Sequence, residues 1–556
     1  MQRTRWVVLS LLALVLIAYG SYTWTNALLD SMFAYRSPLR ASSPPPGVPL
    51  GQALTSRVVM VIVDALREDT SRKADVMPFL NQLRSRGAWA VMYSQPPSWS
   101  QTSWTTLCTG AWPEINDAPA INVDYDKMWP WTQDNIFAAV KRAGLKTAVS
   151  GYDWWEKLIL PEWRDADFFT RGEDDAADRD VLDAALPWLT SGEHQFVLIH
   201  FDQVDYAGHY EGGPRDPRWN AAATRSDAMI QQIAGVLDFK QDTLIVLSDH
   251  GQIDRGGHGG QDPITLVEPF IMVGAGVKPG QYPDVQMVDV APTVAALLGT
   301  NIPAASEGRP LLPMLYADAN RQAQVNAAWS IQQDMVASAY EKAIGAARQP
   351  GATAQERIAR APHSLPATSH LLRLGIVLIA LLGGAAVLIW KRGHDVVLLF
   401  LAAILYVVFY NLVYAVMAGN VYSMSSVSGG ATGFVVEIAK YTLLAVIPAW
   451  LIAMLLSNAF RRGALHAAQA TFSFSFIAIF LLYLPALIGF AVNGATVTWR
   501  LPEPLIIFVH FTNLIQAMLV AVLGIVLSGI AALVSRGMTA DRRPQTARHD
   551  QAKELV

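Results

Sequence analysis

The alternation of apolar and polar positions divides the chain into regions that predict different kinds of structure. Residues from about 55 to 320 carry short apolar runs that alternate with amphipathic helical patterns, which predicts a mostly parallel sheet with helices on both faces. The C-terminal part instead carries five long apolar stretches, near residues 370–390, 395–417, 433–457, 470–492 and 504–534. Each is long enough for a helix to cross a membrane, which takes about 20 residues.

The N-terminus carries a further apolar stretch that predicts a membrane anchor. Arg3 and Arg5 precede an apolar run that begins at Trp6 and continues, with aromatic residues, to about Leu29. No small-x-small cleavage site stands out, so we favour an uncleaved anchor over a cleaved signal peptide. Residues 37–50 follow as a proline-rich, semi-rigid spacer.

Basic residues beside the apolar stretches predict how the chain is oriented. The first arginines place the N-terminus in the cytoplasm by the positive-inside rule. The later basic flanks fall on the same side, with Arg500 as the main exception; they are Lys391, Arg392, Arg461, Arg462, Arg536, Arg542 and Arg543. We therefore expect six crossings of the plasma (inner) membrane, both termini in the cytoplasm and the α/β domain outside it.

These patterns together predict the organisation of the whole chain. The expected segments are a transmembrane anchor (1–29), a Pro-rich linker (30–54), the α/β domain (55–320), a second linker that begins with a helix (321–366), a five-helix transmembrane domain (367–536) and a cytoplasmic tail (537–556). One helix suffices for anchoring, so five more indicate lipid handling, a partner or a path for a lipid-linked substrate. The outer loops Ser423–Gly433 and Thr496–Pro504 are placed to meet the α/β domain.

Polar residues follow several of the predicted strands at the point where each strand ends. The apolar run from Arg57 ends at Asp64, and a second run from Phe196 leads into a loop with Asp205 and His209. A third run, Leu244–Leu247, leads into SDHGQIDRGGHGG, which is rich in glycine. Ligands of open α/β sheets bind at the carboxyl ends of the strands. These polar clusters are therefore expected to meet.

Carboxylates and imidazoles at this edge predict two metal sites. Asp205 and His209 are four residues apart, and His258 can complete their site; Asp64, Asp249 and His250 can hold a second ion. Zinc takes nitrogen and oxygen donors. Two cations about 4 Å apart can clamp the attacking and leaving oxygens of a phosphoryl transfer.

A hydroxyl beside the two cations would be the nucleophile, because a bound cation lowers its pKa. The stretch Pro96–Gly110 offers several. Composition alone does not choose among Ser98, Ser100, Thr102, Ser103, Thr105 and Thr106.

The ordered motifs resemble the alkaline phosphatase superfamily, in its branch of type I nucleotide pyrophosphatase/phosphodiesterases and GPI ethanolamine phosphate transferases. The resemblance rests on five stretches: VVMVIVDALRED, SQTSWTTLCTGAWPE, HFDQVDYAGHYEGGP, LSDHGQIDRGGHGG and VDVAPTVAALLGTNIPAASEGRPL. They cover about residues 55–315. The resemblance implies an alkaline phosphatase-like sheet sandwiched by helices, and two divalent ions, zinc first and manganese as the alternative.

Carried over to this sequence, the resemblance implies a role for each residue. Asp205, His209 and His258 would hold one ion, and Asp64, Asp249, His250 and the nucleophile oxygen the other. The nucleophile of the phosphodiesterases lies ten residues before the glycine of a TG pair, which here gives Ser100. Ser103 takes the place of their phosphate-binding asparagine, which weakens any transfer of nucleotide specificity. The transferases are much longer, with more membrane segments.

Other classes of protein stay open beside this interpretation. Cys108 raises a sulfatase-like hydrolase, although the surroundings of a sulfatase cysteine are missing, and it equally suits a core position. A hydrolase of the nucleotide pyrophosphatase type and a non-catalytic scaffold are further alternatives. His200, inside an apolar strand, is expected to be a buried structural histidine, and Asp202 a loop residue outside the metal shell. The net charge of −4 gives no indication of nucleic-acid binding.

The favoured hypothesis is a membrane-anchored, two-metal phosphodiesterase or phosphotransferase that works through a phospho-serine. Its expected partners are the lipid bilayer and a phosphodiester or phospholipid substrate, such as a lipid or lipid-linked head group.

Overall fold

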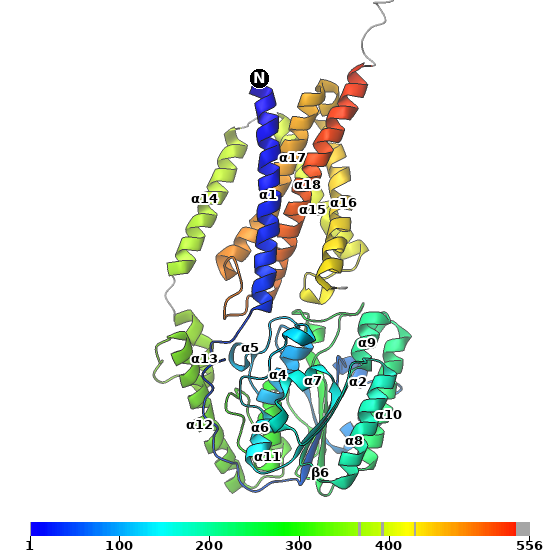
Figure 1. Cartoon of the computed structure of the whole chain (residues 1–556), viewed down its shortest axis with the longest axis vertical. Helices are drawn as coiled ribbons and strands as arrows, with labels where there is room; N and C mark the ends of the chain where they lie inside the picture. Colours follow the sequence, from blue (N-terminus) through cyan, green and yellow to red (C-terminus); the bar gives the residue numbers. More distant parts are fainter. Residues whose placement is uncertain (1, 365–367, 391–393, 428–429, 541–556) are drawn as a thin grey trace, which may run out of the picture.

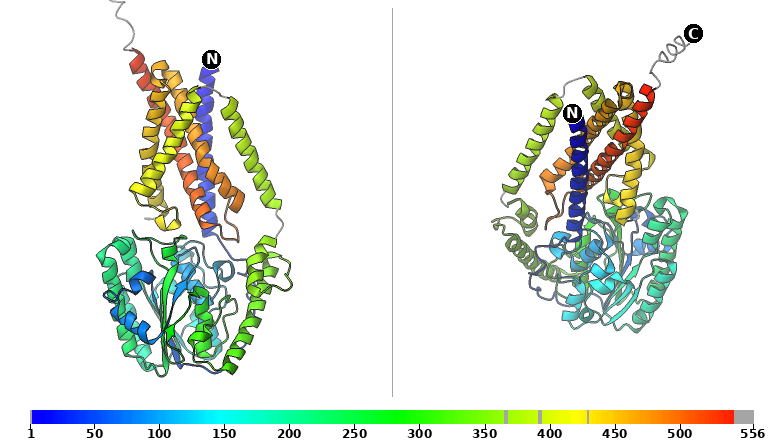
Figure 2. Two further views of the ribbon diagram at one scale, coloured as in Figure 1. Left: turned by 180° about the vertical axis from the view of Figure 1, so that it is seen from behind. Right: turned by 45° about the horizontal axis from the view of Figure 1, so that its top comes forward.

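A computed structural model describes residues 2–364, 368–390, 394–427 and 430–540. It shows an α/β domain at one end of a bundle of long helices (Figure 1). Figure 2 shows the same two-part arrangement from behind and from above.

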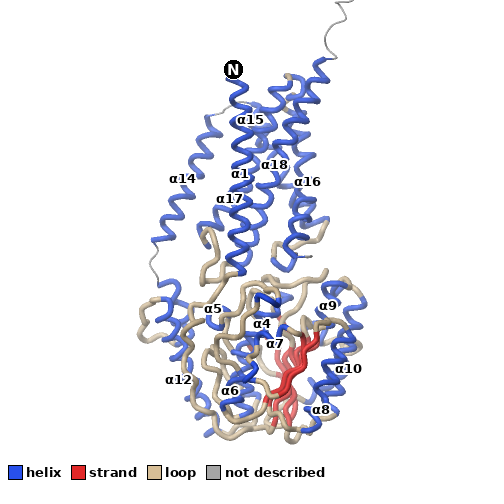
Figure 3. Tube along the Cα trace, viewed as in Figure 1, coloured by secondary structure: helices blue, strands red, loops and turns tan. Residues whose placement is uncertain are grey.

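The α/β domain is built on a mixed, mostly parallel sheet, red in Figure 3. Within the described residues its order is β4-β3-β5-β1-β6-β7-β2-β8, and β9 pairs with β2. Strands β4, β3, β5, β1 and β6 are parallel, and β7 runs antiparallel to β6 and β2. The strands are β1 (Arg57–Val63), β2 (Ala88–Tyr93), β3 (Thr147–Tyr152), β4 (Ala166–Thr170), β5 (Phe196–Phe201), β6 (Asp242–Leu247), β7 (Val267–Gly274), β8 (Gly280–Gln281) and β9 (Val285–Gln286).

Helices cover both faces of this sheet, which confirms the predicted fold class. The central strand β1 is buried along its whole length and sends alternate side chains to two cores. Val58, Met60 and Ile62 join the core under α4, α6 and α11, and Val59 and Val61 join the core under α3, α8 and α10. The helices of this domain are α2 (Glu68–Ser71), α3 (Pro78–Arg86), α4 (Ser100–Thr109), α5 (Pro113–Asn116), α6 (Ile136–Arg142), α7 (Trp154–Leu158), α8 (Asp175–Ser191), α9 (Gln203–Tyr210), α10 (Pro217–Gly235) and α11 (Val290–Leu298).

The stretch expected to begin the second linker is a long helix packed on the α/β domain. Helix α12 (Ala319–Ile344) contributes Val325 to the core beneath β1. Trp329 Nε1 also donates to the carbonyl of Gly308 at 2.8 Å. The shorter α13 (Ala354–Arg360) follows and contacts α12.

The bundle contains helices of membrane-spanning length. They are α1 (Gln2–Phe33), α14 (Thr368–Trp390), α15 (His394–Asn411), α16 (Gly430–Leu456), α17 (Ala464–Asn493) and α18 (Pro504–Ala540). Among the described residues, five are long and apolar enough to cross a membrane: α1, α15 with the π-helical turn that follows it, α16, α17 and α18. The sixth expected crossing falls on α14, whose described apolar stretch, His370–Gly384, is shorter. By length and composition the chain is an integral membrane protein.

Both predicted outer loops contact the α/β domain. Ser423 and its neighbours bond to the loop after β6, and the backbone amide of Leu501 donates to Glu114 Oε1 at 3.2 Å. Lys391, Arg392, Arg542 and Arg543, used to predict the orientation, lie outside the described residues.

Candidate metal centre

Three neighbouring strands deliver the acidic residues to one edge of the sheet. Asp64 follows β1, Asp202 follows β5 and Asp249 lies just beyond β6. The sheet order β5-β1-β6 places these strand ends side by side, although up to 185 residues separate them along the chain. All three carboxylates are buried. The expected meeting of polar clusters at this edge is therefore present.

The segment with Asp205 and His209 is a helix, where the sequence predicted a loop. Helix α9 starts directly after β5, and its i, i+4 spacing puts both side chains on one face. Asp178 on α8 holds the start of α9 by accepting the backbone N–H groups of Asp202 and Gln203, at 2.8 and 3.2 Å. These two hydrogen bonds satisfy N–H groups at the start of α9, which explains why a helix begins there.

The first predicted ligand set comes together around His258. Its Nε2 lies 3.0 Å from His209 Nε2 and 3.6 Å from Asp205 Oδ1, and His209 Nε2 is 3.4 Å from Asp205 Oδ2. Asp205 thus approaches one imidazole with each of its oxygens, and His209 stays outside the groups whose single ligand atoms all lie within 4.8 Å of one another. Two imidazole nitrogens and a carboxylate are a donor set that zinc accepts.

The second predicted ligand set surrounds His250. Its Nε2 lies 3.4 Å from both Asp64 Oδ1 and Asp249 Oδ2, and 3.1 Å from the hydroxyl of Ser100. The rings of His250 and His258 stack with centroids 3.9 Å apart, so the two sets adjoin. Ligand atoms within 4.8 Å of one another form three groups: Asp64, Asp249 and His250; Asp205, His250 and His258; and Asp64, Asp202 and Asp205.

The backbone fixes both imidazoles in the tautomer that a metal ligand needs. His258 Nδ1 lies 2.8 Å from the carbonyl of Ser98, and His250 Nδ1 lies 3.2 Å from the carbonyl of Gly251. A carbonyl only accepts, so each Nδ1 carries the proton and each Nε2 presents its lone pair to the cluster. Burial lowers the pKa of His250 to about 4 and that of His258 to about 3, so both rings are neutral at pH 7.

The carboxylates of the cluster fit a cation. Burial raises the pKa of Asp64 and Asp202 well above the usual range and that of Asp249 to about 6, and neighbouring carboxylates add to each shift. Burial acts in the same direction on Asp205, but the three neighbouring histidines and the hydrogen bond from Gln252 together lower that pKa. Asp64 Oδ1 is buried without a hydrogen-bond partner among the described residues. Positive ions would stabilise all four charges together.

Several supporting residues were missed or given a lesser role from the sequence. His200, expected to be only structural, places Nε2 2.9 Å from Asp64 Oδ2. Asp202 joins the carboxylate group from which it had been left out. Trp104 Nε1 donates to Asp249 Oδ2 at 2.8 Å, and Gln252 Nε2 donates to Asp205 Oδ1 at 2.5 Å. Strand period and motif spacing carry no signal for such partners.

Ser100 is the predicted hydroxyl that lies in the cluster. It begins α4, where the positive end of the helix dipole favours developing negative charge. The hydroxyls of Thr102, Thr105 and Thr106 donate to the carbonyls of Pro119, Gln101 and Thr102 instead. The Ser98 hydroxyl accepts the N–H of Gly259, and Ser103 is buried on the same helix.

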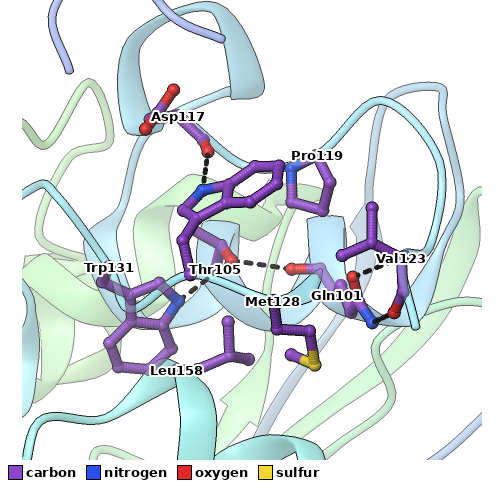
Figure 4. A pocket seen from close by; sticks show the side chains of 9 residues that line it. Gln101, Thr105, Asp117, Pro119, Val123, Met128, Trp131 and Leu158 are labelled. Atoms are coloured by element: carbon purple, nitrogen blue, oxygen red, sulfur yellow. Dashed lines mark hydrogen bonds between the residues drawn. The ribbon is translucent and has the colours of Figure 1, made fainter. Parts of the chain in front are cut away.

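Residues that line a small pocket beside helix α4 hold the helix through hydrogen bonds (Figure 4). Gln101 bonds to both backbone groups of Val123, donating to the carbonyl at 2.8 Å and accepting from the N–H at 3.0 Å. Trp131 Nε1 donates to the hydroxyl of Thr105 at 3.0 Å. These bonds fix the helix that presents Ser100. Cys108, on the same helix, is fully buried in the core, and burial raises the pKa of its thiol.

Comparison with protein families agrees with this site. Residues 58–259 match the model of the family "Type I phosphodiesterase / nucleotide pyrophosphatase". That range contains Asp64, Ser100, the α9 pair and the whole run from Asp249 to His258. This part of the chain is therefore similar to that family, in agreement with the resemblance of its motifs.

Individual proteins similar to this chain include GPI ethanolamine phosphate transferases. Human GPI ethanolamine phosphate transferase 3, catalytic subunit, is 30% identical over 281 residues, which is 46% of this chain and 25% of that protein. The human transferase 2 catalytic subunit is 28% identical over 281 residues, or 47% and 28% of the two chains. The Schizosaccharomyces pombe transferase 2 is 29% identical over 294 residues, or 47% and 39%. The match thus spans about a quarter of the length of the human relatives.

One solved structure serves for comparison. Human ectonucleotide pyrophosphatase/phosphodiesterase 5 aligns with 47% of this chain and all of its own, at 14% identity and a TM-score of 0.40.

Proposed function

We propose that the protein is a membrane-embedded, metal-dependent phosphodiesterase or phosphotransferase, with an ethanolamine phosphate head group as the preferred group transferred. The observation that carries this proposal is that six candidate ligands form two adjoining sets, and that His250 Nε2 in one of them lies 3.1 Å from the hydroxyl of Ser100. The similarity to the human GPI ethanolamine phosphate transferases supports the choice of head group.

Two divalent ions, zinc first, fit the donor sets described above. Asp205, His209 and His258 would hold one, and Asp64, Asp249, His250 and Ser100 the other. When bound, they would lower the pKa of the serine hydroxyl and stabilise charge on the attacking and leaving oxygens.

The chain's own residues then supply positioning and the nucleophile. The Ser100 oxygen attacks phosphorus in line; the Oγ–P bond forms while the bond from phosphorus to the leaving alcohol breaks. The hydroxyl proton passes to solvent, and the leaving alkoxide takes one up from solvent. In the second step an acceptor hydroxyl or water attacks the phospho-serine, the Oγ–P bond breaks and Ser100 regains its proton. Trp104 and His200 hold Asp249 and Asp64 in place throughout.

The helices of membrane-spanning length support a position of this chemistry beside a bilayer. We infer that the α/β domain lies outside the plasma (inner) membrane, with both termini in the cytoplasm. A head group at the outer surface would then be within reach of the site without leaving its lipid.

The experiment that tests this function separates its two versions. Detergent-solubilised protein is incubated with head-group-labelled phosphatidylethanolamine, with and without a glycan acceptor. Label on the acceptor identifies a transferase, and water-soluble label alone identifies a hydrolase. A soluble phosphodiester is tested in parallel. If the label stays on the lipid and the soluble diester is not cleaved, with metals present, both versions are overturned in favour of a non-catalytic scaffold.

A further inference from the structure

A loop of the membrane bundle lies directly on the loop that carries His258. The first, residues 420–427, connects α15 and its π-helical turn (Leu412–Met417) to α16, and we refer to it as the seryl loop after Ser423, Ser425 and Ser426. The second, residues 249–262, is the metal loop. In Figure 1 the lower end of the bundle meets the upper edge of the α/β domain. The residues that join the two loops are more than 160 positions apart along the chain.

Four hydrogen bonds join the seryl loop to the metal loop. The N–H of Gly260 donates to Ser425 Oγ at 3.1 Å, and Ser423 Oγ donates to Asp262 Oδ2 at 2.6 Å. Gln261 Nε2 donates to the carbonyl of Tyr422 at 3.0 Å, and Arg255 Nη2 donates to the carbonyl of Ser426 at 3.1 Å. The bonds flank His258 on both sides in sequence. Ser423 and Ser425 are themselves buried.

Two glycines of the metal loop provide the space for this docking. A Cβ added to Gly260 would lie 1.7 Å from Ser423 Oγ and 2.8 Å from Ser425 Oγ. A Cβ added to Gly257 would lie 2.3 Å from the carbonyl oxygen of Ser425. Gly257 also has a φ of +108°, so its own backbone favours glycine. Gly260 has no such conformation, and its missing side chain is explained by the contact with the seryl loop.

Hydrogen bonds within the loop and to the membrane bundle fix the conformation of the seryl loop. Ser426 Oγ bonds to both backbone groups of Val421, at 3.0 and 2.9 Å, which closes the loop on itself. Tyr414 Oη donates to the carbonyl of Val421 at 3.0 Å, and the Tyr414 ring stacks on Tyr410 with centroids 5.7 Å apart. The π-helical turn that carries Tyr414 is a form often found at functional positions in helices.

An aromatic contact reaches the same histidine from the side of the nucleophile. Trp99, next to Ser100, packs edge to face on His258 with centroids 5.3 Å apart. Its ring fills the space beside Gly259, where a Cβ would lie 2.4 Å from it. Trp99 also packs against the apolar core of the membrane bundle. His258 therefore lies in a loop that is bonded to the bundle, and its ring contacts Trp99, which also packs against the bundle.

We propose that the seryl loop is a positioning element of the metal centre, which holds the metal loop so that His258 meets Asp205 and His209. The membrane bundle is then a structural part of the site and not only its anchor. This inference rests on the proposed two-metal function. Outer partners that orient a ligand typically change metal affinity about 10–100-fold when they are removed.

The test uses the full-length protein in detergent, with Co²⁺ as the probe in place of the native ion. Gly260→Ala inserts a methyl group against Ser423, whereas Gly235→Ala adds one at the end of α10, where nothing lies within 4 Å. Cobalt affinity and the visible d–d absorption spectrum are measured for both. We expect Gly260→Ala to weaken one cobalt site by about tenfold or more and to change its spectrum. Gly235→Ala should match the wild type.

Two further variants keep the test independent of a folding defect. Ser425→Ala removes only a hydroxyl and should weaken the same cobalt site, while Gly260→Ala with Ser423→Gly should recover part of the lost affinity, because the closest clash is removed. Unchanged affinity and spectrum in folded Gly260→Ala or in Ser425→Ala would overturn the proposal.

Hydrogen exchange of the metal-free protein separates this proposal from the proposed function. Ser425→Ala should speed exchange at the amides of residues 257–261, where Gly260 loses its acceptor. Unchanged exchange there would overturn the docking even if the wild type binds cobalt. Wild-type protein that takes up no cobalt would instead overturn the two-metal function.

Discussion

His200 Nε2 lies 2.9 Å from Asp64 Oδ2, within the buried carboxylate cluster. Both side chains are almost fully buried, and burial lowers the pKa of His200 to about 3. The neutral ring is hydrogen-bonded to Oδ2 through Nε2, which leaves Asp64 Oδ1 facing His250. A histidine inside an apolar strand is thus the partner that orients a candidate metal ligand.

Replacing His200 tests this role. His200→Phe keeps a ring in the core but removes the hydrogen bond to Asp64, so the metal site of Asp64, Asp249 and His250 should weaken by about 10–100-fold. Titration with Zn²⁺ and metal analysis of the purified protein measure the change. His194→Phe is the matched control, because His194 is also buried but lies just before the other end of β5. Equal zinc binding by His200→Phe and wild type would show that the contact only packs the core.

Substitutions along α4 test the nucleophile. Ser100→Ala should lower kcat on a soluble phosphodiester by roughly 10³-fold or more, because a nucleophile has no substitute in the covalent step. Thr102→Ala, two residues on, should keep most of the activity, since its hydroxyl donates to the carbonyl of Pro119. The opposite result, with Thr102→Ala inactive and Ser100→Ala active, would move the nucleophile to Thr102.

The cap of α9 predicts a pH-dependent effect on stability. Burial raises the pKa of Asp178 to about 7, although the N–H groups of Asp202 and Gln203 act against the shift. The carboxyl is thus more easily protonated in the folded state than in the unfolded chain, where its pKa is about 4. Its contribution to stability is therefore largest below pH 4 and falls as pH rises from about 4 to about 7.

Asp178→Asn should remove this pH dependence. The Tm of the variant minus that of the wild type should increase from pH 5 to pH 7 and then level off. Asp180→Asn, at an exposed position of the same helix, is the control and should show a constant difference. A constant difference for Asp178→Asn as well would show that the carboxyl is ionised in the folded protein over this range.

Much of the site was predictable because strand ends are visible in the sequence. The apolar runs that end at Asp64 and Asp249 predict buried strands, and parallel strands bring their carboxyl ends to one edge. Ordered motifs then assigned the ligands to two sets, and the structure brings the members of each set together. The choice of Ser100 required the family resemblance, since composition offered six hydroxyls.

The remainder depends on contacts between distant segments. Helix α9 was expected as a loop, because the capping that starts it comes from Asp178 on another helix. His200, Trp104 and Gln252 gain their roles only once β5, α4 and the metal loop lie together. The outer loop at Ser423 was expected to meet the α/β domain, but its partner, the glycine at position 260, follows only from the packing.

The covalent intermediate is the most direct test of the central claim. The protein is mixed with metal and phosphatidylethanolamine deuterated in its head group, quenched in acid within the first turnovers, digested and analysed by mass spectrometry. We predict a phosphoethanolamine adduct on Ser100 that carries the deuterium and is absent from Ser100→Ala. Product formation without an adduct on Ser100, or with the adduct on another residue, would contradict the account.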